Sequence, residues 1–214
     1  MLLRFIITLG CLFSFSSASS TPGYNTPILL NLDSYHSLDP YQQAIDGDIK
    51  LHLTLVFTQM SNEMIAAVKD PLEESLRNSS ILNKMIKDVS LNFREFGLLG
   101  NHLVAFYAPK DQTLKRYQEF VEKIRQSIRE MARQMGDLQY SQKDMVEYGR
   151  LGKDIVYTMD IRTPLPHVSL KYAGTAEEVQ KLNALWQNGV LPKPKLIFIR
   201  LDQIEIQLTK AIDL

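Results

Sequence analysis

One four-residue pattern occurs twice in this sequence, and it constrains the fold more than any other feature. His52-Leu53-Thr54-Leu55 and His167-Val168-Ser169-Leu170 both follow the order histidine, apolar, hydroxyl, apolar. Side chains alternate between the two faces of a β-strand, so each copy predicts a strand with buried aliphatic residues and a histidine and a hydroxyl on the other face. A chance double match among four histidines has odds of about 1 in 300, so we treat the pair as one signal.

Alternation and helical spacing predict the elements around these strands. A strand at 51–58 should turn its leucines and Phe57 toward the core. Apolar residues at three- and four-residue spacing predict the strongest helix at 111–135, which Gly136 ends. The basic residues of this helix, Arg125 among them, are interleaved with glutamates, which favours a solvated face over a groove for a polyanion.

The other segments complete an α+β pattern. Residues 19–50 contain three prolines and two glycines and predict an extended entry segment before one domain at 51–214. Turn and capping signals then predict a helix in pieces at 61–89, with its best start signal at Asp70-Pro71 and an interruption at Asn78-Ser79-Ser80. A hairpin of strands 91–96 and 102–107 should follow, and a long loop or short hairpin at 137–163. The last predicted elements are a strand at 167–172, a helix at 175–186 capped by Thr175 and Glu178, and a strand or strand pair at 195–208.

Residues 1–18 predict a secretory signal peptide. Arg4 precedes an apolar run, and small residues ending at Ala18 offer a cleavage point, so we expect a secreted or periplasmic protein. The apolar run is too short to span a bilayer, and no later segment is apolar enough, so no membrane span is expected. The only cysteine, Cys11, lies in this segment, which excludes disulfides from the mature chain; the alternative is a lipoprotein anchored through Cys11.

The charge of the chain limits its partners. Twenty-four lysines and arginines balance twenty-four aspartates and glutamates, so the formal net charge is zero. This balance argues against binding of nucleic acid or anionic membranes through bulk charge. Any anion site must therefore be local.

The two motifs resemble those of the two-histidine (2H) phosphoesterase superfamily, which includes RNA 2',3'-cyclic phosphodiesterases and the so-called 2'-5' RNA ligases. The order of elements over about residues 50–208 is also similar to that family. The resemblance implies an α+β fold with two pseudo-symmetrical lobes of antiparallel sheet, helices packed outside, an active cleft between the lobes and one motif from each lobe. It also implies that His52 and His167 are catalytic, that Thr54 and Ser169 bind the substrate phosphate, and that no metal or cofactor takes part.

The chemistry of these four side chains agrees with those roles. Opening a 2',3'-cyclic phosphate needs a base to take a proton from water and an acid to protonate the departing ribose oxygen, and two imidazoles can do both. Two hydroxyls can donate hydrogen bonds to the non-bridging oxygens. We therefore expect an exported, metal-independent phosphodiesterase that acts as a monomer on a ribose 2',3'-cyclic phosphate or a 2'-5' phosphodiester, in a nucleotide or short RNA.

Several alternatives stay open at this stage. A non-catalytic module that binds a nucleotide or RNA end would need the same four side chains, and a ligase would use them in reverse. A third alternative is an exported structural or interaction domain, in which the two matching strands would be accidental. His36 is expected in a surface loop and His102 at a structural or exposed position, and no pair of histidines has the i, i+4 spacing typical of helical zinc sites.

Overall fold

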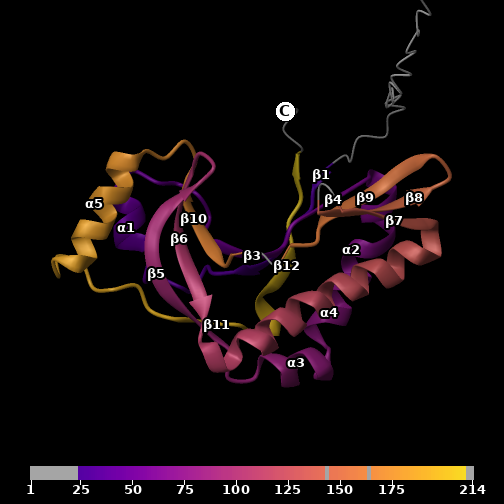
Figure 1. The fold of residues 1–214 in the computed structure, drawn as a ribbon, viewed down its shortest axis with the longest axis horizontal. Helices are drawn as coiled ribbons and strands as arrows, with labels where there is room; N and C mark the ends of the chain where they lie inside the picture. Colours follow the sequence, from indigo (N-terminus) through magenta and orange to yellow (C-terminus); the bar gives the residue numbers. More distant parts are fainter. Residues whose placement is uncertain (1–23, 143–144, 163–164, 211–214) are drawn as a thin grey trace, which may run out of the picture.

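The strands form two sheets in the computed structural model, which describes residues 24–142, 145–162 and 165–210 (Figure 1). The described strand pairs are antiparallel. In this part of the chain the first sheet has six strands, in the spatial order β13 (Thr209–Lys210), β1 (Tyr24–Asn25), β4 (Thr58–Met60), β9 (Asp154–Asp160), β8 (Val146–Leu151) and β7 (Asp137–Ser141). The second has seven, in the order β11 (Ile197–Phe198), β5 (Ser90–Leu99), β6 (His102–Pro109), β10 (His167–Lys171), β3 (His52–Val56), β2 (Ile28–Asn31) and β12 (Ile204–Ile206).

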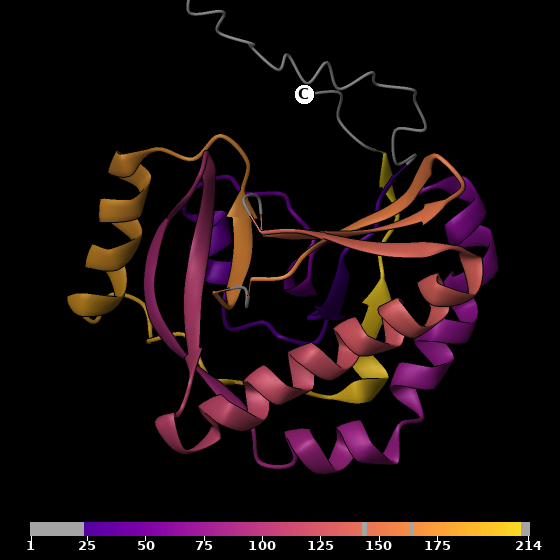
Figure 2. The ribbon, with the colours of Figure 1, turned by 45° about the vertical axis from the view of Figure 1, so that its right-hand side comes forward.

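Helices pack against both sheets, which confirms the predicted α+β class. They are α1 (Asp39–Gln43), α2 (Asn62–Arg77), α3 (Ser80–Ile86), α4 (Asp111–Met135), α5 (Ala176–Gln187) and the short 3-10 helix η1 (Leu201–Gln203). Figure 2 shows α1 and α5 beside the β5–β6 hairpin, α2 on the opposite side of the molecule, and α4 running diagonally from the lower end of the hairpin toward α2. Helix α4 contacts β7 and β8 of one sheet and β3 and β6 of the other, so it joins the two sheets.

The export signal predicted at 1–18, including Cys11, lies outside the described residues. None of the helices in the ranges given above is both long enough and apolar enough to cross a bilayer. A chain with a single cysteine cannot form an internal disulfide.

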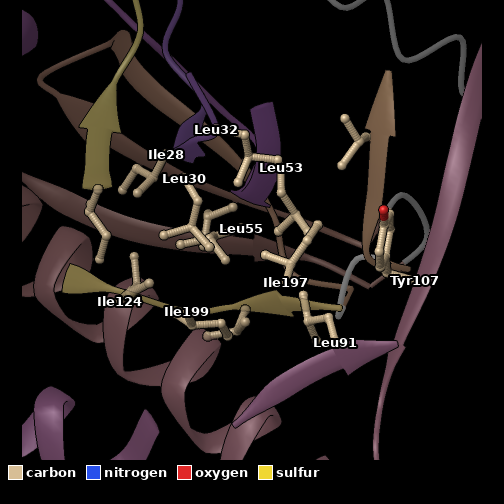
Figure 3. Close-up of a cluster of buried hydrophobic side chains, with 14 of the residues drawn as sticks. Ile28, Leu30, Leu32, Leu53, Leu55, Leu91, Tyr107, Ile124, Ile197 and Ile199 are labelled. Carbon is tan, nitrogen blue, oxygen red and sulfur yellow. The ribbon is translucent and has the colours of Figure 1, made fainter. Parts of the chain in front are cut away.

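The apolar positions of both motifs lie in the core. Leu53, Leu55, Val168 and Leu170 are fully buried, as their alternation predicts. Figure 3 shows Leu53 and Leu55 in a cluster that includes aliphatic residues of β2, α4 and the C-terminal segment, among them Ile124. Burying a large aliphatic side chain contributes about 1.5 to 3 kcal/mol, so these residues anchor both motif strands.

The alternation of the first motif strand changes after Leu55. Strand β2 pairs Ile28 with Val56 but Leu29 with Thr54, so β3 carries one extra residue there. A bulge of this kind reverses which side chains face the core. Phe57 is therefore 45% exposed and Val56 is buried, and the prediction that Phe57 points into the core was wrong.

The first long helix starts earlier than its proline suggested. Helix α2 begins at Asn62 after Ser61, whose Oγ accepts a hydrogen bond from the backbone N–H of Met64 at 3.3 Å. The predicted helical segment from 61 is confirmed, but the start signal expected at Asp70-Pro71 marks no helix start, because Pro71 lies inside the helix. Proline costs about 3 kcal/mol in a helix interior, and buried apolar residues at four-residue spacing on both sides of it, at 64, 68, 72 and 76, offset that cost. The predicted interruption is confirmed, since α3 starts after Ser79.

Helix α4 has the predicted bounds, but one of its cations is not on a solvated face. Arg125 is only 2% exposed, and its guanidinium donates hydrogen bonds to the carbonyl oxygen of Arg162 and to Glu122. Arg129 is likewise held by Glu122 and Glu147. Glu122, one of the glutamates interleaved in this helix, therefore binds two arginines of the same helix. The spacing of charges in the sequence does not show whether such an arginine faces solvent or is held by a partner.

The segment after α4 is a three-stranded meander of β7, β8 and β9 where a long loop or short hairpin was predicted. At the centre of this meander Gly149 leaves room for the ring of Tyr157, which a Cβ atom would approach to 2.3 Å. The capping prediction for α5 is confirmed, because Thr175 and Glu178 form a reciprocal capping box.

Candidate active site

The two motif strands are direct neighbours. Strands β3 and β10 pair antiparallel in the seven-stranded sheet, with Leu53 opposite Val168. The two motifs, expected one from each lobe, therefore meet within a single sheet. Both strands bury their aliphatic residues in the same hydrophobic core, and this shared burial favours their pairing side by side in the sheet.

The register brings the four predicted site residues together. With Leu53 opposite Val168, the antiparallel ladder places His52 opposite Ser169 and Thr54 opposite His167. Residues directly opposite each other point to the same face of a sheet, with Cβ atoms about 4.5 to 5.5 Å apart. Each imidazole thus lies beside the hydroxyl of the other motif, on the face away from Leu53. Thr54 is half-buried and Ser169 is 9% exposed.

Both histidines are held in the same way. Nδ1 of His52 donates to the carbonyl oxygen of Lys50 at 2.9 Å, and Nδ1 of His167 donates to the carbonyl oxygen of Leu165 at 2.8 Å. A carbonyl oxygen can only accept, so the proton of each neutral ring is on Nδ1. Nε2 is then the nitrogen that can take a proton from a ligand or return one to it.

The electrostatic surroundings of the two imidazoles differ. Burial lowers the pKa of each histidine below its ordinary value of 6.5. For His52 the bond to the Lys50 carbonyl and the charge of Glu205 raise the pKa again, while the charge of the Lys50 side chain lowers it. The bond to the Leu165 carbonyl likewise raises the pKa of His167, but its charged neighbours are the cationic forms of His52 and His102, and both lower its pKa.

We expect NMR titration of the ring protons to give pKa values below 6.5 for both histidines, with assignments from the variants His52→Gln and His167→Gln. The unfolded chain then binds more protons than the folded chain between the folded pKa values and 6.5. The free energy of unfolding should therefore rise with pH across this interval and fall as the pH is lowered through it. A measured pKa above 6.5 for either ring would contradict the desolvated site described here.

Several neighbours of the site gave no signal in the sequence. Asn31 lies opposite His52, and its Nδ2 donates to Oε2 of Glu205 at 3.1 Å. Phe106 lies opposite His167, and its ring lies across Gly97, where a Cβ atom would come within 2.7 Å of the ring. These contacts join strands that are far apart in the sequence, so no local pattern could indicate them.

The other two histidines lie outside the motif strands. His36 is exposed and its Nδ1 lies 2.9 Å from the carboxylate of Asp39, in agreement with the predicted surface position. His102 is half-buried, and its ring contacts the ring of Tyr172. Over the described ranges, no group of three or more histidine, aspartate or glutamate side chains is arranged to hold a metal ion.

Compared with models of protein families and with curated proteins, the chain has no significant match. The geometry of His52, Thr54, His167 and Ser169 is therefore the basis for any assignment of function. The four side chains provide two groups that can exchange protons and two hydrogen-bond donors on one face of the sheet, which is the set of groups that hydrolysis of a phosphodiester requires.

Proposed function

We propose that this protein is an exported phosphodiesterase of the two-histidine type, which hydrolyses a ribose 2',3'-cyclic phosphate or a 2'-5' phosphodiester. The observation that carries the proposal is the antiparallel pairing of the two motif strands at Leu53 and Val168, because this register sets each imidazole opposite the hydroxyl of the other motif. Both rings are oriented by backbone carbonyls, so both Nε2 atoms are free of that structural role. Two oriented imidazoles and two hydroxyls fit a phosphate whose attacking and leaving oxygens need opposite proton transfers.

In the proposed reaction a water oxygen bonds to phosphorus as the bond to one ribose oxygen breaks. One neutral imidazole takes the proton from the water, and the protonated imidazole gives its proton to the departing ribose oxygen. Thr54 and Ser169 donate hydrogen bonds to the non-bridging oxygens, where negative charge increases in the transition state.

The charges around the rings support one assignment of roles. A pair that shares one proton holds it on the imidazole with the more negative surroundings, and Glu205 favours the charged form of His52 against the smaller opposing effect of the Lys50 charge. The cationic neighbours of His167 disfavour its charged form. We therefore assign His52 as the acid and His167 as the base for hydrolysis.

The test is turnover of a defined panel: nucleoside 2',3'-cyclic phosphates, 2'-5' dinucleotides and 3'-5' dinucleotides, in excess EDTA, with products identified by ³¹P NMR. The double variant His52→Ala/His167→Ala, purified identically, controls for contaminating nucleases. Hydrolysis by the natural protein and none by the double variant would support the proposal. Tight binding of the same nucleotides without turnover would favour the binding module, and neither binding nor turnover would contradict both.

A further inference from the structure

Two aromatic rings meet at the end of the site where Ser169 lies. His102 begins β6 and Tyr172 follows directly after β10. Their ring centroids are 4.8 Å apart and the rings are inclined at 74°, an edge-to-face contact. The motifs do not include either residue, and hydrolysis as proposed above does not use them.

The pleat places both rings on the face that carries the motif histidines. Leu103 pairs with Lys171, and Leu103 is fully buried. Nζ of Lys171 donates to the carbonyl oxygen of Ile45 and to Glu178, on the side where α1 and α5 lie. The register of β10 on β6 shifts between Ser169 and Lys171, so this bulge turns Lys171 away from the face that carries Ser169 and His167. Side chains alternate again from there, so the next residue on each strand, His102 and Tyr172, projects to the face of the motif histidines.

The ring of Tyr172 is exposed and contacts His102, and the chain that follows it is held in place. Its side chain is 58% exposed, whereas four other tyrosines are fully buried. The chain after it is held by a hydrogen bond from the N–H of Gly174 to the carbonyl oxygen of Asn101 at 2.8 Å. Gly174 also packs so closely on Leu103 that a Cβ atom would come within 2.5 Å. A rigid, exposed aromatic ring loses little entropy when a flat ligand stacks on it.

The spacing suits a nucleotide. The bulge between Ser169 and Lys171 shortens this part of the chain, so Tyr172 is level with His102, two residues along β6 from the partner of Ser169, or about 7 Å at roughly 3.4 Å per residue. This span leaves room for a ribose between a phosphate at the motifs and a base at the ring. Aromatic side chains stack on any base, because every base has a π-face.

We propose that Tyr172, braced by His102, is a base-stacking subsite, and that the site selects nucleotides over simple phosphate esters. The inference rests on the proposed function only for the position of the phosphate. It adds a source of affinity that the two motifs do not supply.

Calorimetric titration tests the subsite without requiring turnover. The probes are adenosine 2'-monophosphate, which has a base, and inorganic phosphate, which has none. The natural protein should bind the nucleotide more tightly than phosphate. Tyr172→Ala should weaken nucleotide binding by about 5- to 150-fold and leave phosphate binding unchanged, because it removes one stacking contact. Tyr172→Phe should bind like the natural protein.

A matched control is Tyr140→Ala, which removes a tyrosine that is 50% exposed on β7 of the other sheet. It should change neither affinity. Equal loss of both ligands in Tyr172→Ala, no loss of either, or no nucleotide binding by the natural protein would overturn the subsite. Absence of hydrolysis together with the expected binding pattern would refute the phosphodiesterase and leave the subsite standing.

Discussion

Alanine at His52 or at His167 should lower kcat/KM for the preferred phosphodiester by about 100- to 10,000-fold, the usual contribution of a general acid or base. Each substitution removes one of the two proton transfers while the buried neighbours Leu53 and Val168 remain in the core. The measurement is steady-state hydrolysis, together with thermal unfolding to establish that both variants fold.

His36→Ala is the matched control for these two variants, because His36 is exposed and its Nδ1 lies 2.9 Å from the carboxylate of Asp39, outside the two motifs. It should retain full activity. A loss below about fivefold in both His52→Ala and His167→Ala would contradict their assignment as acid and base, whatever the substrate.

Removing the hydroxyls should have the second largest effect. Thr54→Val and Ser169→Ala should each lower kcat by about 10- to 1,000-fold, because each deletes one hydrogen-bond donor to the phosphate oxygens in the transition state. Valine keeps the branched shape of threonine, so packing beside His167 is preserved. Kinetics with one substrate, in parallel with calorimetric binding of inorganic phosphate, would measure both consequences.

Thr54→Ser is the control that keeps a hydroxyl at this position and should retain most of the activity. If valine and serine at position 54 gave the same rate as the natural protein, the phosphate-binding role of Thr54 would be wrong. The same comparison at position 169 uses Ser169→Thr against Ser169→Ala.

Local patterns predicted much of the fold. The spacing of apolar residues in α4 and the capping box of Thr175 and Glu178 at α5 are each confined to a single helix, so the sequence reveals them directly. Both predictions are confirmed. Pro71 misled the prediction because its local cost is offset by burial against distant elements. The third strand of the β7–β9 meander was missed although β9 buries Val156, Tyr157 and Met159, because the largely exposed β7 carries little periodicity and hid the pattern of the segment as a whole.

The site was only partly predictable for a related reason. The sequence identifies His52, Thr54, His167 and Ser169 by their repeated pattern, but not the register that pairs the two strands. Register depends on how both strands fill one core, which is a property of the assembled sheet. Glu205 and Tyr172 reach the site from other strands or strand ends, so their relevance is visible only in the folded chain.

The pH dependence of kcat/KM tests the two-histidine mechanism most directly, when measured for the natural protein and both alanine variants in excess EDTA. The natural protein should show a bell-shaped profile whose limbs belong to the coupled pair, with its maximum below pH 6.5, because the pKa of each ring is lowered. His167→Ala should lose the ascending limb and His52→Ala the descending limb in the residual activity. A single ascending limb in the natural protein, unchanged in either variant, would contradict the mechanism.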